Sequence, residues 1–344
     1  MTRTFFAAAL WLAATGRVFA FTSNAGGNAS QFLTLGAGAR ALGMGEAFGP
    51  VAEGAEAIYW NPAGLAALRT QDFIYDHSEF LRFFRYDFAA YALPVSLLHG
   101  TVAASLARFS QDDLTAVTNT NQSVGTFSPH GEAVSLAYAY DFGRPDPRQS
   151  DREYFRDNWA LAESYRPLER ELEPWSGHLM AGLAIKVINE TIYDRSSAAV
   201  ALDGGALYRP LDWDELRMSF AFRNLGSKQN FGADLEDLPS EMDAGLAYDL
   251  HLDQGRLLSA LEAAVPTYGN PYGKIGFEFT SPVAPQVSMA YRLGYKTLAA
   301  TDLGILSGLT IGVGVNYKKF SLDFGFEPMA ALGEVYRLSL GFRY

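Results

Sequence analysis

Hydrophobic and polar residues alternate along much of this chain, and the alternation is most regular near its end. In Gly308–Tyr317, leucine, isoleucine, valine and tyrosine occupy every second position, while glycine, threonine and asparagine fill the positions between them. The same pattern returns in Lys319–Glu327 and in Glu334–Tyr344. Successive side chains of a strand point to opposite faces, so a period of two predicts strands with one oily face and one polar or small face.

The alternation recurs through most of the chain and predicts an all-β fold of about fourteen antiparallel strands, each long enough to cross a membrane when tilted. A soluble sandwich also alternates, but repetition behind an export signal favours a transmembrane β-barrel. The predicted strands are Asp72–Leu81, Arg85–Leu93, Thr101–Phe109, Glu132–Phe142, Gly177–Asn189, Ala198–Tyr208, Arg217–Leu225, Glu241–Leu250, Leu257–Val265, Tyr272–Thr280, Gln286–Gly294, Gly308–Tyr317, Lys319–Glu327 and Glu334–Tyr344.

Residues 1–20 have the features of a secretory signal peptide. Arg3 supplies the positive charge, Phe5–Ala14 the apolar core and Val18–Ala20 a small-residue cleavage site. The apolar run is too short for a helix that crosses a bilayer. We therefore predict export and, with the barrel, localisation in the outer membrane of a Gram-negative-type bacterium.

Composition and motifs limit the kinds of function that this chain can have. The chain has 344 residues, a net charge of −11 and no cysteine. An acidic chain argues against nucleic acid as a partner, because phosphate contacts need clustered lysine and arginine. The five histidines show no metal-binding spacing, and no nucleophile-elbow motif occurs. In Asp76-His77-Ser78 a strand points the histidine away from the other two side chains, so we predict no enzyme, no metal site and no cofactor.

The stretch 21–70 precedes the first predicted strand and is rich in glycine and alanine. Small residues permit close backbone packing. Asn61 followed by Pro62 is typical of a helix cap and its first helical residue. We predict a plug folded inside a barrel formed by 71–344, with a lid packed on a β-domain as the alternative.

Arg40 is the one charged residue of the small-residue run Gly36–Gly45. Inside a barrel it would need an anionic partner, because an unpaired buried charge is costly. The candidates on predicted inward faces are Asp203, Asp243, Glu278 and Asp323.

Four runs in this stretch carry a family resemblance. Gln31–Leu33, Gly38–Gly45, Ala47-Phe48 and Tyr59–Leu65 resemble the start of PorV/PorQ family outer-membrane proteins, relatives of the FadL fatty-acid transporters. Asp323-Phe324 and Leu332-Gly333 extend the resemblance to the last strands. It implies a barrel of about fourteen strands. It also implies a plug motif with a structural or gating role, carried by Arg40, Gly43, Gly45, Asn61, Pro62, Ala63 and Gly64.

The resemblance implies two possible functions. The main prediction is a component of protein secretion or surface export, similar to type IX secretion, with exported cargo or machinery proteins as partners. The alternative is a FadL-like channel for hydrophobic small molecules. Its apolar ligand contacts would be Phe32, Leu35, Met44 and Phe48, which could equally form the core of the plug.

An even number of strands places both ends of the barrel on the periplasmic side. The long connections Ser110–Pro129, Gly226–Ser240 and Tyr295–Ser307 then face outward, and the shorter ones face the periplasm. Near the outer rim, Arg82, Arg85 and Arg108 could meet anionic lipid headgroups or serve as ordinary interface anchors.

One long connection, 143–174, falls on the periplasmic side and breaks this asymmetry. A helix is predicted there from Asp151 to about Tyr165. It either packs under the barrel rim or docks a periplasmic partner through Tyr154, Trp159 and Tyr165.

Overall fold

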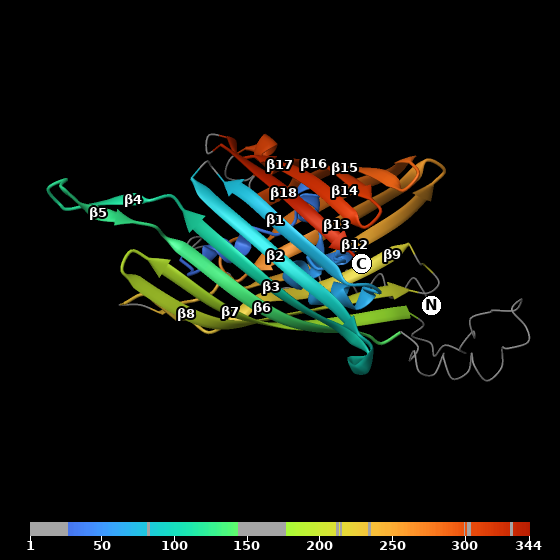
Figure 1. Cartoon of the computed structure of the whole chain (residues 1–344), viewed down its shortest axis with the longest axis horizontal. Helices are drawn as coiled ribbons and strands as arrows, with labels where there is room; N and C mark the ends of the chain where they lie inside the picture. The colour runs from blue at the N-terminus through green and yellow to red at the C-terminus, as the bar shows by residue number, and fades with distance from the viewer. Residues whose placement is uncertain are drawn as a thin grey trace, which may run out of the picture.

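The computed structural model describes residues 27–80, 83–143, 177–210, 213, 215–232, 235–298, 300, 304–330 and 333–344. Fourteen strands close into one barrel, and each pairs antiparallel with both neighbours (Figure 1). The wall strands are β1 (Asp72–Phe80), β2 (Phe84–Val95), β3 (Gly100–Gln111), β6 (His130–Asp141), β7 (Gly177–Ile192), β8 (Arg195–Pro210), β9 (Leu216–Gly226), β12 (Glu241–Leu252), β13 (Gly255–Pro266), β14 (Tyr272–Ala284), β15 (Val287–Lys296), β16 (Leu309–Tyr317), β17 (Phe320–Pro328) and β18 (Glu334–Arg343).

All fourteen predicted strands are present, and their ends differ from the prediction by only a few residues. The oily face points outward. In β16, Ile311 and Val313 are exposed, whereas Thr310, which lies between Leu309 and Ile311, is buried and faces the lumen. The closed antiparallel barrel confirms the predicted fold class.

Two short hairpins were not predicted. They lie in the connections after β3 and β9, and in Figure 1 the first projects well beyond the wall. We call the barrel end with these hairpins the mouth, and the opposite end, where β1 begins and β18 ends, the base. The hairpin strands are β4 (Leu114–Val117), β5 (Ser123–Phe127), β10 (Gln229–Asn230) and β11 (Leu235–Glu236).

The wall contains an irregularity between β8 and β9. Leu202 pairs with Leu225 but Gly204 pairs with Phe222, so two residues of β9 lie opposite one residue of β8. Those two residues, Arg223 and Asn224, are both buried. Asn224 has a φ of 57°, a conformation that asparagine tolerates better than most residues. The bulge therefore directs two polar side chains inward where a regular strand would direct one.

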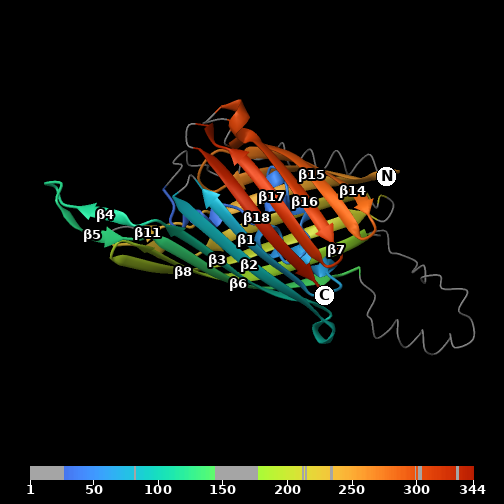
Figure 2. The same cartoon turned by 45° about the horizontal axis from the view of Figure 1, so that its top comes forward.

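The N-terminal segment lies inside the barrel as a plug (Figure 2). It runs from the mouth, where Ala29 N donates to Asp237 O (3.1 Å), to the base, where Ala55 N donates to an Asp72 carboxylate oxygen (3.0 Å). Asn61 Oδ1 accepts from Ala63 N (3.1 Å), which confirms the predicted cap. The helical turns of the plug are η1 (Gln31–Thr34), α2 (Ala39–Gly43), η2 (Gly49–Val51), α3 (Ala57–Trp60) and η3 (Pro62–Ala67).

Some predictions concern parts of the chain outside the described residues. These are the signal peptide 1–20, Arg82, and the helix with Tyr154, Trp159 and Tyr165. Within the described ranges, no helix combines the length and apolar character needed to cross a bilayer.

Candidate functional site

The inner wall has two chemically different halves. On β2, β3, β6, β7 and β8 the buried inward positions are mostly alanine, and they join one hydrophobic cluster with the plug. We call this side the alanine half. Its apolar inward residues are Tyr86, Phe88, Ala90, Ala92, Ala103, Ala107, Ala133, Ala137, Ala139, Ala184, Ile188, Ala199 and Ala201.

The other side of the lumen, from β9 and β12 round to β18, is lined by buried charges, and we call it the charged half. Ions buried here must pair with one another or with the plug, because a lone buried charge is costly. The buried charged residues are Arg223, Asp243, Asp249, Glu262, Lys274, Glu278, Arg292, Asp323, Glu327 and Arg337.

Arg40 links the plug to the charged half. Its Nη2 lies 2.8 Å from Glu278 Oε1, and its Nη1 lies 2.7 Å from Glu53 of the plug itself. Glu278 also accepts from Arg292 Nε (2.6 Å), and Arg292 in turn pairs with Asp323 (2.7 Å). The expectation that Arg40 meets an inward carboxylate is therefore confirmed, with Glu278 as the partner.

The remaining candidate partners of Arg40 bind other cations. Asp243 pairs with Lys274 (3.0 Å), which also contacts Glu262 (2.8 Å). Asp203 pairs with Lys186 at 2.7 Å. The Lys274 contacts join β12, β13 and β14 into one ionic surface of the charged half. The Lys186–Asp203 pair instead joins β7 to β8 within the alanine half, next to Asn224 of β9.

Wall side chains also satisfy backbone groups of the plug. Helical turns of three to six residues leave most of their N–H groups without an internal partner. Side-chain oxygens of the wall accept these hydrogens, so plug and wall complete each other's hydrogen bonding. The pairs are Ser30 N with Glu190 (2.8 Å), Gly38 N with Asp76 (2.8 Å), Ala39 N with Ser339 (2.6 Å), Gly45 N with Thr310 (2.9 Å), Gly49 N with Glu262 (2.7 Å) and Ala55 N with Asp72 (3.0 Å).

Helix α2 lies directly on the backbone of the charged half. Gly276 on β14 and Gly294 on β15 pair with each other and face the plug. A Cβ at Gly294 would lie 1.9 Å from Gly45 N, and one at Gly276 would lie 2.3 Å from Met44 O. Only glycine permits this approach, so the wall is shaped to receive the Gly43–Gly45 part of the plug motif.

The second part of the plug motif contacts the opposite wall. Turn η3 packs against β3, β6, β7 and β8. Asn61 Nδ2 donates to Ala206 O (3.3 Å), and a Cβ at Gly182 would lie 2.4 Å from the carbonyl carbon of Pro62. Arg40, Gly43 and Gly45 of the plug motif thus contact the charged half, whereas residues 61–64 of the motif contact the alanine half.

The four candidate apolar ligand contacts pack within the plug and its surroundings. Phe32 stacks on Phe109 of β3 with ring centroids 6.2 Å apart, and Phe48 lies 6.1 Å from the Trp60 ring. Met44 is fully buried and Leu35 packs at the edge of the same cluster. None of the four lines either of the two cavities described next.

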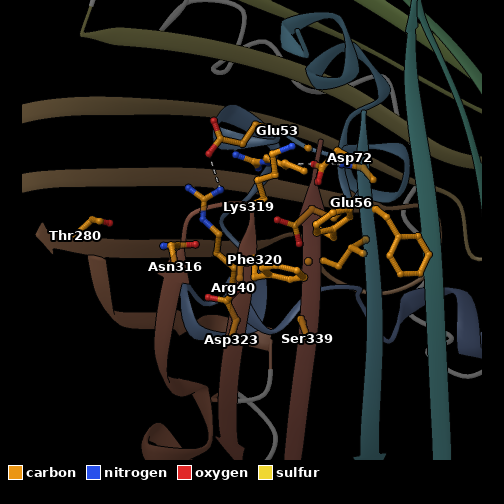
Figure 3. A pocket seen from close by; sticks show the side chains of 18 of the residues that line it. Arg40, Glu53, Glu56, Asp72, Thr280, Asn316, Lys319, Phe320, Asp323 and Ser339 are labelled. Atoms are coloured by element: carbon orange, nitrogen blue, oxygen red, sulfur yellow. Dashed lines mark hydrogen bonds and ion pairs between the residues drawn. The ribbon is translucent and has the colours of Figure 1, made fainter. Parts of the chain in front are cut away.

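A cavity of about 270 Å³ lies at the base between the plug and strands β1 and β13–β18 (Figure 3). We call it the base cavity. Its lining is largely charged and includes Arg40, Glu53, Glu56, Asp72 and Lys319. A second cavity of about 50 Å³ adjoins Glu53 on the β7–β9 side. Both cavities therefore lie beside charged side chains near the base of the barrel, where water or polar groups would be favoured.

Glu56 of the plug is the least compensated acid of the base cavity. Its side chain is buried, and its Oε2 has no hydrogen-bond partner. Burial raises the pKa of this carboxyl to about 8, and the carboxylates of Asp323, Asp76 and Asp72 act in the same direction, whereas Arg40 opposes the rise. The plug therefore holds a carboxyl that stays largely protonated at neutral pH.

This carboxyl predicts a pH dependence of plug docking. The docked pKa is above the free value of 4.5, so the stabilisation is complete below pH 4.5 and is lost as the pH rises through about 8. We expect undocking, measured as single-channel conductance or protease access to the plug, to increase progressively between about pH 5 and pH 8 and to change little above that. Glu56→Gln should flatten this dependence, and an unchanged profile in that variant would contradict the assignment.

Of the other residues singled out in the sequence, His77, Arg85 and Arg108 lie on the outer face. Asp76 and Ser78 are buried toward the plug while His77 points outward and contacts Asp87 (2.8 Å), as the strand geometry predicted. Near the mouth, Arg85 pairs with Asp112, and Arg108 pairs with Glu132 at 3.4 Å. Among the residues described, no group of three or more histidine, aspartate or glutamate side chains is placed to hold a metal ion.

Sequence reasoning missed the division of the lumen, the role of Glu56 and the contribution of Arg337. Arg337 is fully buried on β18 and donates to Leu35 O (2.6 Å) and Ser78 Oγ (2.8 Å). A signal was available, since inward positions can be assigned from the alternation. Comparing them strand by strand separates an alanine-rich set on the early strands from a charged set on the later ones.

No protein-family model and no curated protein matches this sequence. Solved structures match at the level of the fold. A deltaS2S3 mutant of the monoaromatic hydrocarbon channel TodX has a TM-score of 0.51 at 9% identity, covering 90% of this chain and 98% of that one. The toluene transporter TbuX of Ralstonia pickettii gives 0.50 at 10% identity, with coverages of 90% and 98%. Pseudomonas putida TodX gives 0.50 at 9% identity, with coverages of 89% and 96%.

These structural neighbours are transporters of hydrophobic compounds of the FadL type. At about 10% identity the likeness shows a shared fold. It does not reach the narrower PorV/PorQ assignment, and it gives no support to a role in type IX secretion.

Proposed function

We propose that this chain is an outer-membrane channel through which hydrophobic small molecules pass, closed at rest by its plug. The observation that carries the proposal is the two-sided lumen. An apolar solute gains from contact with alanine and aromatic surface and is repelled by buried charge. The outward apolar strand face and the fold shared with toluene transporters support the same function.

The proposed path follows the alanine half. At the mouth, Phe32 of the plug stacks on Phe109, which stacks on Phe84 with centroids 5.6 Å apart. An aromatic or aliphatic solute could replace one ring of this column without exposing the others to water. Below it, the inward side chains of β3 and β6 are mostly short, so a small displacement of the plug would open an apolar passage along these two strands, beside the buried Lys186–Asp203 pair of β7 and β8.

The plug is held differently on its two sides. The charged half binds it by the ion pairs of Arg40 and by Arg337, whereas η3 meets the alanine half mainly through apolar packing. We therefore propose that η3 separates from the alanine half while α2 stays docked.

The function is tested by uptake. Cells that lack their own hydrophobic channels and express this protein should take up labelled toluene faster than cells with an empty vector, with no gain for a sugar of similar size. Equal toluene uptake in the two strains would overturn the proposed function.

Engineered disulfides test the path, and the absence of native cysteine makes each pair unique. On the alanine half, A63C/G182C joins positions where a Gly182 Cβ would lie 2.6 Å from Ala63 N. The matched control on the charged half is L42C/G325C, whose Cβ atoms would lie 3.2 Å apart. A Cβ at Gly182 would also lie 2.4 Å from the Pro62 carbonyl carbon, so reduced A63C/G182C should have a loosened η3 and take up toluene at least as fast as the wild type. Oxidation should lower uptake in A63C/G182C, whereas oxidised L42C/G325C should keep the uptake of its reduced form. Uptake that oxidation leaves unchanged in both variants would contradict a path along the alanine half.

A further inference from the structure

The turn between β16 and β17 carries a local excess of positive charge at the base. It consists of Lys318 and Lys319, and Lys319 O accepts from Arg343 N of β18 (2.8 Å). The Arg343 side chain is more than half exposed, with its Nε 3.5 Å from Asp72. Other short turns at this end have no lysine or arginine: they read Ser-Leu-Leu-His at 96–99, Asp-Gln at 253–254 and Pro-Gln at 285–286.

Aromatic and aliphatic side chains surround this turn on the outer face. Tyr317, Phe320 and Phe342 lie beside it, and the Phe320 and Phe342 rings are 4.8 Å apart. Further from the base, Leu322 and Leu340 continue an exposed apolar surface on β17 and β18. This order, apolar then aromatic then cationic, matches the depth profile of a phospholipid from acyl chain to headgroup.

The base cavity extends this surface inward. Its lining joins the outward Phe320 and Phe342 to Lys319 and to the plug acid Glu56, so it reaches from the outer rim to the plug (Figure 3). Lys319 and Arg343 lie at its rim. Deeper in the cavity, carboxylates lie beside the buried guanidinium groups of Arg40 and Arg292. Asp72 and the unpartnered Oε2 of Glu56 offer acceptors on the inner side.

We propose that this rim binds one phospholipid whose headgroup carries a phosphate and a primary ammonium, as phosphatidylethanolamine does. The phosphate would lie among Lys318, Lys319 and Arg343, and the acyl chains along Leu322 and Leu340. The ammonium would point into the base cavity toward its carboxylates. The site rests on the membrane placement proposed above but not on the transport of any solute.

The test is lipid retention by the full-length protein purified in mild detergent, followed by native mass spectrometry with added synthetic lipids. We expect one phosphatidylethanolamine per barrel, held more tightly than phosphatidylglycerol, which lacks the ammonium. K318Q/K319Q should weaken retention by roughly tenfold or more, as the loss of two headgroup-facing cations implies. R85Q/R108Q removes two cations at the mouth and should leave retention unchanged.

Three results would overturn the site. They are no retained lipid in the wild-type protein, equal retention in K318Q/K319Q, and equal retention of phosphatidylglycerol. Soluble glycerophosphoethanolamine binding as tightly as the lipid would show that a free phosphate ester is the ligand. Toluene uptake should survive in K318Q/K319Q. In the wild-type protein, retained lipid without toluene uptake would count against the channel and not against this site.

Discussion

Gly294→Val is expected to displace the plug and open the barrel. The Cβ at this position would lie 1.9 Å from the backbone nitrogen of Gly45, and backbone cannot move aside as a flexible side chain can. The cost should exceed the roughly 1–3 kcal/mol of ordinary overpacking in a core. Planar-bilayer conductance, and uptake of hydrophilic antibiotics too large for the plugged barrel, should both rise strongly.

Gly273→Val is the matched control. Gly273 lies on β14, and a Cβ there would meet no atom within 4 Å. This variant should insert normally and keep the low conductance of the wild-type protein. If G294V and G273V conduct alike and remain as closed as the wild type, the plug does not rest on β15 in the way described.

Removal of the Arg40 guanidinium should produce the second large effect. Arg40→Met leaves Glu53 without its cation and takes from Glu278 one of its two arginine partners. Breaking a buried pair by removing one partner costs about 3–5 kcal/mol. We expect the plug to become accessible to protease while the wall remains folded, because the fourteen wall strands pair independently of this contact.

Two further variants test whether loss of the Arg40 ion pairs causes this increase in plug access. Arg40→Lys keeps the charge but not the two-pronged geometry, so its effect should be intermediate. Arg85→Met removes an arginine that is also paired, but at an exposed position near the mouth, and should change plug access little. Equal protease access in R40M and R85M would show that the Arg40 pairs do not hold the plug.

The fold could be predicted because a barrel wall follows one local rule. Each strand has one face toward the outside and one toward the lumen, so alternation around Ile311 or Leu338 already reveals a strand and its orientation. The short strand β4 was not predicted because it has no buried face to impose a period, and β10 was not predicted because two residues are too few to show one. The bulge at Arg223 and Asn224 was not predicted because it is a shift in the register between two strands, and the sequence of one strand does not determine that register.

The site could be predicted only in part. A lone arginine among small residues was enough to infer that Arg40 needs a carboxylate, and Glu278 was among the candidates. Which candidate it meets depends on where α2 docks around the barrel, and that depends on paired glycines on two separate strands. The raised pKa of Glu56 likewise arises from burial and from carboxylates on β1 and β17, so its own surroundings in the sequence give no hint.

The enclosure of the plug has a consequence for biogenesis. The first and last wall strands, β1 and β18, pair with each other from Asp72 and Arg343 to Phe80 and Val335, and this seam completes the ring. Once the ring is closed, the plug can enter only through one of its two ends. We expect the N-terminal segment to be gathered inside the curving sheet before the seam closes, because its backbone N–H groups and the inward carboxylates of the wall then satisfy each other during closure. In that order of events the plug is an assembly template before it is a barrier.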